Sequence, residues 1–374
     1  MKMYFKNGTV LRGDQFQEGM SFTIGGGEII ALSPAENMTK QESGTMIDLQ
    51  GRYVVPGLID LQLYGTEGFF FGGEPTVENL RGMEDHLLRQ GVTRFLATVA
   101  TNVDDVVLEA IHAAKEFRRE SRGAFMGLHL EGPFLNPEKR GAHPRKLIRK
   151  GTVEEAKKWI DLAEGEIKMM TVAPEWQEKA LLDYLKGEGI VLSVGHSNAT
   201  YEEAYLFLNE TVKTATHLFN AMPLLHHRHP GLVAAIFQQQ TYASIIADGI
   251  HVSYPMIRLA KRELGCRLFL ITDAVASATT GIYPHQRKEN YYTTPDGILS
   301  GSSLELLDAV KNCVEHAGIA VGEAFAMATE YPAKVMGWEG HRGTFTVGDP
   351  ADFLILDHDF NLLQVWFKGE RITG

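Results

Sequence analysis

Residues 95–130 read FLATVATNVDDVVLEAIHAAKEFRRESRGAFMGLHL, and their pattern is the clearest indication of the fold class. Two short apolar runs, at 95–100 and 125–130, flank a longer helix-like segment at 103–119. A strand, a helix and a second strand in this order are typical of a parallel sheet, because parallel neighbours need a long crossover connection. The stretch therefore predicts one strand–helix–strand unit.

The same alternation continues along the middle of the chain. Further apolar runs lie at 58–63, 167–172, 190–194, 213–218, 243–247 and 268–271. Further helix-like segments lie at 77–90, 153–164, 176–186, 201–208 and 254–264, with late helices expected at 304–317 and 322–336. Together with the first two runs these make eight strand candidates, which predict a (β/α)8 TIM barrel. The alternative is an open doubly wound sheet, but no glycine-rich dinucleotide fingerprint follows the first run.

The two ends of the chain resemble each other and differ from the middle. Short β-type runs broken by glycine-rich turns occupy residues 1–56, and similar runs lie at 352–357 and 365–369. We expect an α/β protein in which residues 57–345 form the barrel. Residues 1–56 and 346–374 would together form a small β-sandwich domain.

Composition narrows the function classes. The chain has 374 residues, of which 44% are hydrophobic and 22% charged, so it is an ordinary globular chain. A net charge of −11 argues against a broad surface for nucleic acid or for an anionic membrane. Two cysteines exclude a disulfide scaffold, and no apolar run is long enough to span a membrane. We expect a cytoplasmic protein.

Acidic residues and histidines cluster where the predicted strands end, which is where a TIM barrel carries its catalytic groups. These residues are Asp60, His129, Glu131, His196, His217, Asp248, His251 and Asp273. Buried strand ends have little use for such side chains unless they are paired or bind a metal.

Among these residues, Glu131, His196 and His217 indicate a specific kind of site most clearly. One carboxylate and two imidazoles with an open fourth position are typical of a catalytic metal site that acidifies a bound water. The alternative is that each side chain is a buried polar group satisfied by hydrogen bonds. Asp273 could act as general base and then as general acid. Its alternative role is a helix N-cap, because Ala274 begins a short apolar stretch.

Arg228 lies in a local basic cluster, HHRH at 226–229, on an otherwise acidic chain. The planar guanidinium fork suits a phosphate group. The alternative is a solvated loop, and the following Pro230 and Gly231 make a loop the expected structure.

Several motifs carry a family resemblance. The segments GLHLEGPF (127–134), VGHS (194–197), THLFNAM (216–222), IADGIH (246–251) and ITDA (271–274) resemble those of the N-acetylglucosamine-6-phosphate deacetylases, a family of the amidohydrolase superfamily. The segments VVPGLID (54–60) and GTFTVGDPAD (343–352) resemble the entry to and exit from the barrel in that superfamily. The resemblance covers nearly the whole chain.

The resemblance implies metal-dependent hydrolysis of the acetamide of N-acetyl-D-glucosamine 6-phosphate, an amino-sugar phosphate, to D-glucosamine 6-phosphate and acetate in amino-sugar catabolism. Glu131, His196 and His217 would hold one divalent metal per chain, zinc first, with Fe(II), Co or Mn as alternatives. Asp273 would activate water and then protonate the amine. His143 would polarise the acetyl carbonyl.

The resemblance also implies a substrate-binding set and a partner. The set comprises Ala142, His143, Asn220, Ala221, Arg228, His251, Leu304, Glu305 and Leu306. Arg228 and His251 would hold the phosphate. The family resemblance further suggests a homodimer, with loops of one subunit near the phosphate site of the other.

Two departures from the family pattern leave parts of the specificity open. Many amidohydrolases carry His-x-His on the first strand, where this chain has Gln62 and Tyr64, so we expect no second metal. The segment 274–281 and the short connection to 301–303 also differ, which leaves the sugar epimer and the acyl preference open. The alternatives are a galactosamine-type deacetylase, another amidohydrolase, or a non-catalytic barrel.

Overall fold

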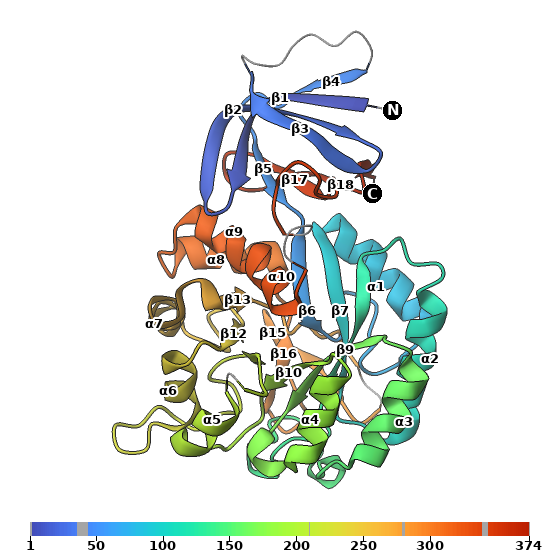
Figure 1. Ribbon diagram of the computed structural model, residues 1–374, viewed down its shortest axis with the longest axis vertical. Coiled ribbons are helices and arrows are strands. Elements are labelled where there is room, and N and C mark those ends of the chain that lie inside the picture. Colours follow the sequence, from blue (N-terminus) through green and yellow to red (C-terminus); the bar gives the residue numbers. More distant parts are fainter. Residues whose placement is uncertain (1, 36–43, 209, 279–280, 339–342, 374) are drawn as a thin grey trace.

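The computed structural model describes residues 2–35, 44–208, 210–278, 281–338 and 343–373. A parallel barrel forms the lower part of the molecule and a sheet made from both ends of the chain lies above it (Figure 1). Thr279 and Thr280, which belong to the unusual segment after Asp273, lie outside the described residues.

Eight parallel strands form the barrel, and each of the apolar runs identified in the sequence overlaps one of them. The strands are β6 (Leu58–Leu63), β7 (Val92–Ala100), β8 (Phe125–Glu131), β9 (Ile167–Val172), β10 (Val191–Val194), β11 (Thr214–Ala215), β12 (Tyr242–Ile245) and β13 (Leu268–Leu270). They neighbour one another in sequence order, so the predicted barrel is confirmed.

The last strand meets the first through the residues that follow it. The backbone N–H of Asp273 donates to the carbonyl of Gln62 at 2.9 Å, and that of Tyr64 donates to the carbonyl of Ala274 at 2.8 Å. These bonds nearly close the barrel. They also place Asp273 beside Gln62 and Tyr64, which lie more than 200 positions earlier in the sequence.

Helices follow most of the strands and cover the outside of the barrel (Figure 1). They are α1 (Val77–Arg89), α2 (Asp104–Phe117), α3 (Val153–Ala163), α4 (Lys179–Gly187), α5 (Tyr201–Phe207), α6 (Gly231–Gln238), α7 (Tyr254–Leu264) and α8 (Leu306–Glu315). Threonine side chains cap the first turns of α1, α3 and α5 by accepting a backbone N–H, which is why these helices begin where they do. Helix α6 was not predicted, because it is apolar on nearly all sides and lacks helical periodicity.

The prediction of a single late helix at 322–336 is wrong, because the structure has two helices in this region. These are α9 (Val321–Ala328) and α10 (Glu330–Met336), which meet at Thr329. In one continuous helix the ring of Pro332 would clash with the carbonyl of Ala328, four residues earlier. The break places Pro332 in the first turn of a new helix, where a proline costs no hydrogen bond.

The two ends of the chain form one eight-stranded sheet, as expected for a separate β domain. Its strands are β1 (Lys2–Arg12), β2 (Gln15–Gly25), β3 (Glu28–Pro34), β4 (Thr45–Asp48), β5 (Tyr53–Pro56), β17 (Phe353–Leu356), β18 (Leu362–Phe367) and β19 (Glu370–Ile372). β17 pairs with β5, which joins the C-terminal strands to the N-terminal ones. Phe5, Phe22, Phe353 and Trp366 pack together in its core. The division at residues 56 and 346 stays a prediction.

A buried ion pair links this sheet to the barrel. Arg94 on β7 contacts the Asp352 carboxylate at 2.6 Å, and Asp352 also accepts the backbone N–H of Lys368. Asp352 ends the GTFTVGDPAD segment, so the structure supplies a physical reason for an acidic residue there.

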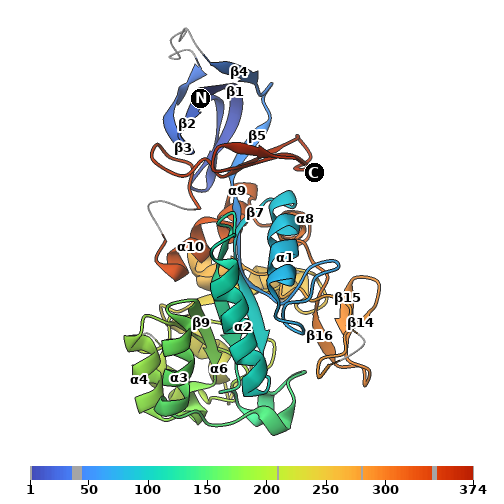
Figure 2. The same ribbon diagram turned by 90° about the vertical axis from the view of Figure 1, so that its right-hand side faces the viewer.

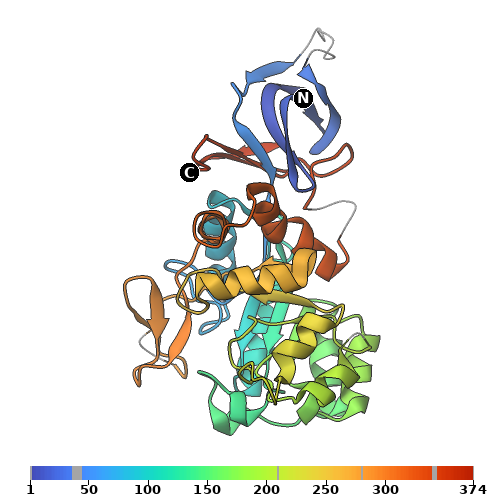
Figure 3. The same cartoon turned by 90° about the vertical axis from the view of Figure 1, so that its left-hand side faces the viewer.

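A three-stranded antiparallel sheet lies between β13 and α8, where only a short loop was expected. It consists of β14 (Gln286–Arg287), β15 (Tyr291–Thr293) and β16 (Leu299–Ser302), and it projects from the side of the barrel (Figures 2 and 3). The strands are too short for their alternation to be evident in the sequence. Within the described ranges, no helix combines the length and the apolar character needed to cross a membrane.

Candidate active site

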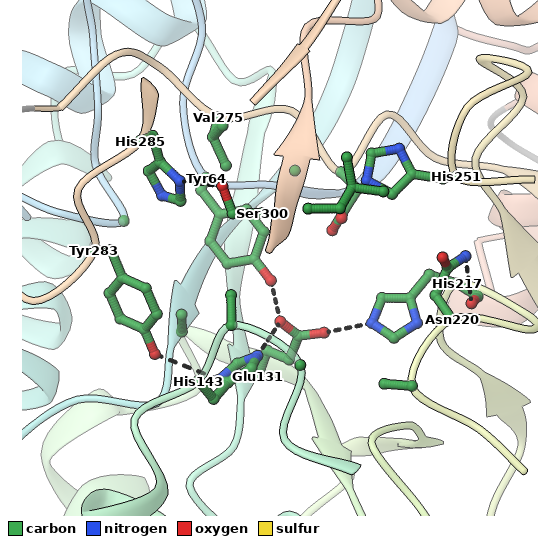
Figure 4. A pocket seen from close by; sticks show the side chains of 18 of the residues that line it. Tyr64, Glu131, His143, His217, Asn220, His251, Val275, Tyr283, His285 and Ser300 are labelled. Atoms are coloured by element: carbon green, nitrogen blue, oxygen red, sulfur yellow. Dashed lines mark hydrogen bonds and ion pairs between the residues drawn. The ribbon is translucent and has the colours of Figure 1, made fainter. Parts of the chain in front are cut away.

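A cavity opens at the carboxyl ends of the barrel strands (Figure 4). This position agrees with the rule that TIM-barrel active sites lie on this face. The sequence-predicted residues that line it are Glu131, Ala142, His143, His196, His217, Asn220, Ala221, His251 and Asp273.

Glu131 occupies the centre of the cavity floor, at the end of β8, and its two carboxylate oxygens have different neighbours. Oε1 lies 3.1 Å from His217 Nε2 and 3.4 Å from His196 Nε2. Oε2 lies 3.2 Å from His143 Nε2 and accepts the hydroxyl of Tyr64. One carboxylate oxygen therefore faces the two histidines at the ends of β10 and β11, and the other faces the opposite wall.

His196 is held by its own backbone and by a carbonyl. Gly195 precedes it, and a Cβ atom at Gly195 would lie 2.6 Å from Thr171 Cγ2, so only glycine fits between the neighbouring strands. His196 Nδ1 lies 2.8 Å from the carbonyl of Lys139, so we assign the proton to that nitrogen. Its Nε2 is then left with a lone pair directed at Glu131.

His217 approaches the same point from the next strand. Its backbone N–H donates to Ser244 Oγ at 2.8 Å, and its Nε2 lies 3.1 Å from His196 Nε2. His196, His217 and Asp273 have φ values of 48°, 33° and 53°, a left-handed conformation that is uncommon outside glycine. The backbone turns sharply at each strand end, and such strain is concentrated at functional sites.

The chemistry and spacing of these donors fit a metal ion. Glu131 Oε1, His196 Nε2 and His217 Nε2 are separated by 3.1, 3.1 and 3.4 Å. Ligand atoms that bind zinc tetrahedrally at about 2.0–2.1 Å stand roughly 3.3 Å from one another. Glu131, His143 and His196 form a second group of suitable donor atoms, all within 4.8 Å. We favour the first group, because His143 approaches the other oxygen of Glu131.

Asp273 faces this cluster from the seam of the barrel. Gln62 Nε2 donates to Asp273 Oδ1 at 2.8 Å and to Glu131 Oε1 at 3.1 Å, so one amide holds both carboxylates. Burial raises the pKa of Asp273, and the nearby His217 opposes that increase. A carboxyl group with a raised pKa is suited to accept a proton and return it.

The electrostatics of His143 and Glu131 also follow from burial and contacts. Burial lowers the pKa of His143 to about 4, so its imidazole is neutral near pH 7. Burial alone would raise the pKa of Glu131, but hydrogen bonds from the histidines, that of His143 first, hold it well below its usual value. An ionised carboxylate is the state in which Glu131 can bind a metal.

The polar wall of the cavity comes from the loops after β11 and β12. Asn220 Nδ2 donates to the carbonyl of His217 at 3.3 Å. His251 Nδ1 lies 2.6 Å from Asp248 Oδ2, which orients the imidazole. The carboxylate of Asp248, one of the strand-end residues, thus holds a cavity residue in place.

Four predicted substrate residues lie elsewhere. Arg228 is exposed in the loop before α6. It is not one of the described residues that line the cavity. Leu304, Glu305 and Leu306 line a separate, adjacent cavity. That these four contact the substrate stays a prediction.

Two strand-end residues lie inside the barrel. His129 is fully buried, with Nε2 2.7 Å from Thr171 Oγ1 and Nδ1 3.0 Å from the carbonyl of Leu61. Asp60 accepts the hydroxyl of Thr272 at 2.6 Å. These hydrogen bonds explain both residues as parts of the barrel interior.

One wall of the cavity was not predicted from the sequence. Tyr64, Phe70, Val275, Tyr283 and His285 line it. Tyr64 was considered only as a poor metal ligand, and a lone histidine such as His285 in a loop carries no chemical signal by itself. The departure of segment 274–281 from the family pattern was the available signal, because this segment builds part of that wall.

Comparisons with known proteins agree with this geometry. The amidohydrolase family model matches residues 53–372. The N-acetylglucosamine-6-phosphate deacetylase of Haemophilus influenzae is 34% identical over 359 residues, 92% of each chain. The N-acetylgalactosamine-6-phosphate deacetylase of Escherichia coli O157:H7 is 30% identical over 93% of each chain. The crystal structure of N-acetylglucosamine-6-phosphate deacetylase from Pasteurella multocida has a TM-score of 0.92 and 33% identity over 99% of each chain.

Proposed function

Because the chain belongs to the amidohydrolase family, and within it to the N-acetylglucosamine-6-phosphate deacetylases, we propose that it hydrolyses N-acetyl-D-glucosamine 6-phosphate to D-glucosamine 6-phosphate and acetate. One observation supports this proposal at the level of individual residues. Glu131, His196, His217 and Asp273 meet in a single cavity at the carboxyl ends of the strands.

We assign one divalent metal per chain to Glu131, His196 and His217, with zinc first and Fe(II), Co or Mn as alternatives. The donor set of one carboxylate and two imidazoles supports this assignment. When bound, the metal supplies a Lewis acid that acidifies water and polarises a carbonyl oxygen. Gln62 and Tyr64 provide no good ligand for a second ion.

Asp273 moves the protons in the proposed reaction. Its carboxylate takes a proton from the attacking water while Gln62 holds its Oδ1 atom. A carbon–oxygen bond forms at the acetyl carbon, and the carbon–nitrogen bond then breaks. Asp273 returns the proton to the departing nitrogen, which leaves as the amine of glucosamine 6-phosphate, and acetate remains.

His143 stabilises the charge that develops on the acyl oxygen. Its Nε2 faces the cavity beside Glu131. In the tautomer with the proton on Nε2, the neutral ring donates a hydrogen bond to that oxygen. A donor of this kind is typically worth about 3–4 kcal/mol in the transition state.

The polar wall binds the sugar phosphate. Asn220, Ala221 and Ala142 lie where they can contact sugar hydroxyls, and His251, oriented by Asp248, lies where it can contact the phosphate. Arg228 lies outside the cavity of its own chain. We propose that its loop reaches the cavity of a second subunit in a homodimer. The dimer and the cytoplasmic location stay predictions.

Acetate release tests the proposal. The substrates are N-acetylglucosamine 6-phosphate, the unphosphorylated sugar and the galacto epimer, each with and without a chelator. We expect chelator-sensitive release from the phosphorylated gluco sugar and at least tenfold lower kcat/KM for the other two. Equal release from the unphosphorylated sugar would contradict the phosphate site, and equal or greater release from the galacto epimer would contradict the sugar assignment.

A further inference from the structure

We propose that one side of the cavity, bounded by Tyr64, Phe70, Val275, Tyr283, His285 and Leu299, binds the acyl group of the substrate and accepts acyl chains longer than acetyl. We call this side the aromatic lobe. The proposal rests on the deacetylase activity proposed above and concerns only the acyl substituent.

The cavity has two unlike sides, with Glu131 between them (Figure 4). Tyr64, Val275, Tyr283 and His285 lie on one side, whereas His217, Asn220 and His251 lie on the other. The first side belongs to a buried apolar cluster that joins Tyr64, Val275 and Tyr283. The second side presents an amide and an imidazole.

The chemistry of the substrate decides which part occupies which side. A sugar phosphate carries hydroxyl groups and negative charge, so it needs the side with Asn220 and His251. The substituents of a planar carbonyl carbon point away from one another. If the amide nitrogen and its sugar lie on the polar side, the alkyl group on the carbonyl carbon points toward the aromatic lobe.

Three polar atoms of the lobe already have hydrogen-bond partners in the protein. The hydroxyl of Tyr64 donates to Glu131, and that of Tyr283 donates to the carbonyl of Thr101 at 2.6 Å. His285 Nδ1 lies 3.0 Å from Ser300 Oγ. Burial lowers the pKa of His285 to about 4, so the ring is uncharged near pH 7. Most of the surface that the lobe presents to an acyl chain therefore consists of aromatic and aliphatic carbon atoms.

The rings form a continuous wall. Phe70 and His285 pack edge to face with centroids 5.2 Å apart, and His285 stacks on Tyr283 with centroids 6.2 Å apart. A single methyl group contacts only a small part of such a surface. Each further methylene that leaves water for this wall is expected to raise kcat/KM by about fourfold at most.

The test is an acyl series on one sugar. N-acetyl-, N-propionyl- and N-butyrylglucosamine 6-phosphate all release the same amine, so one amine assay serves the three substrates. We expect kcat/KM for the propionyl and butyryl compounds to equal or exceed that for the acetyl compound. A tenfold or greater loss at propionyl, with acetyl still hydrolysed, would overturn the lobe alone. No amine from any of the three would overturn the deacetylase activity and this inference with it.

A variant whose larger side chain fills the aromatic lobe provides a second test of the proposal. Val275→Phe is expected to lower the butyryl-to-acetyl ratio of kcat/KM at least tenfold. Val347→Phe, at an exposed valine outside the cavity, is the matched control and should leave that ratio unchanged. An unchanged ratio in folded Val275→Phe contradicts the proposal.

A binding measurement avoids both turnover and the risk that Val275→Phe fails to fold. Titration calorimetry of the Asp273→Asn variant with the acetyl and butyryl compounds should show equal or tighter binding of butyryl. Tenfold weaker binding of butyryl would overturn the proposal.

Discussion

Asp273 combines a strained backbone, a raised pKa and a fixed neighbour in one residue. Replacement by Asn keeps the size of the side chain but removes its ability to accept and return a proton. We expect Asp273→Asn to lower kcat by about 10³-fold, within the range typical of general acid–base groups. Metal content should stay near that of the unchanged protein, because the assigned ligands are intact. Acetate release and metal analysis check this, and near-normal turnover would refute the proton-transfer role.

Gly195 shows how a residue without a reactive side chain can fix the position of a neighbouring site residue, His196. An added Cβ would lie 2.6 Å from Thr171 Cγ2 and 2.9 Å from Thr216 Cβ, both in the barrel interior. We expect Gly195→Ala to destabilise the fold by about 1–3 kcal/mol, as overpacking does, and to weaken metal binding by shifting His196. Urea unfolding measures the stability.

Gly187, at the end of α4, provides the matched control. A Cβ there would meet nothing within 4 Å, so Gly187→Ala should change the free energy of unfolding little. If both variants were equally stable, the packing argument for Gly195 would fail.

At the scale of elements, α1 carries a buried carboxylate that organises the entry to β8. Glu84 Oε1 accepts the hydroxyl of Ser121 at 2.6 Å and the backbone N–H of Ala124 at 2.8 Å, and Oε2 accepts the N–H of Arg122 at 2.8 Å. β8 ends in Glu131, so this helix residue helps to set the strand that carries the proposed metal ligand.

We expect Glu84→Gln to lower the free energy of unfolding by about 1–3 kcal/mol, because an amide nitrogen would oppose one of these backbone donors. Glu109→Gln, at an exposed residue of α2, is the control and should change stability by less than about 0.5 kcal/mol. Thermal and urea unfolding compare the two variants. Equal stability would show that the loop does not depend on the charged carboxylate.

On the scale of the whole molecule, a buried ion pair couples the terminal sheet to the barrel. Arg94 lies 2.6 Å from Asp352, and its guanidinium also packs over the ring of Phe367 at 5.1 Å. We expect Arg94→Met to destabilise the protein by about 3–5 kcal/mol, because it leaves the Asp352 charge buried without its partner. Lys157→Met breaks an exposed pair with Asp161 and should cost less than about 1 kcal/mol. Similar losses in both variants would contradict the coupling.

Metal removal tests the barrel as one unit. The assigned ligands are Glu131, at the end of β8, and His196 and His217, which lie just after β10 and β11 respectively, so a bound ion ties together three strands of the barrel, with β9 lying between β8 and β10. Zinc at one hundred times its Kd should stabilise the folded state by about 2.7 kcal/mol over the chelated protein. Calorimetry should therefore show a higher Tm with zinc, and no such increase in a His196→Ala variant. Identical melting with and without zinc would contradict the assigned site.

The local patterns of the sequence were enough to predict the strand order of the barrel and the residues of the proposed metal site. Apolar runs and helix-like segments are local patterns, and parallel strands can be joined only through crossovers, so sequential alternation implies sequential neighbours. Because catalytic groups lie at strand ends, the polar residues at or just beyond the ends of these runs predict Glu131, His196, His217 and Asp273 as site residues.

Which of these residues meet, and what surrounds them, depends on how the chain folds in space. Gln62 touches both Asp273 and Glu131 because the barrel closes on itself, and no local pattern encodes a contact across 211 positions. The aromatic lobe likewise depends on short strands and an irregular segment that lack periodicity. The structure also places Arg228 outside the cavity of its own chain, whereas the break before α10 has a local cause, the proline at position 332.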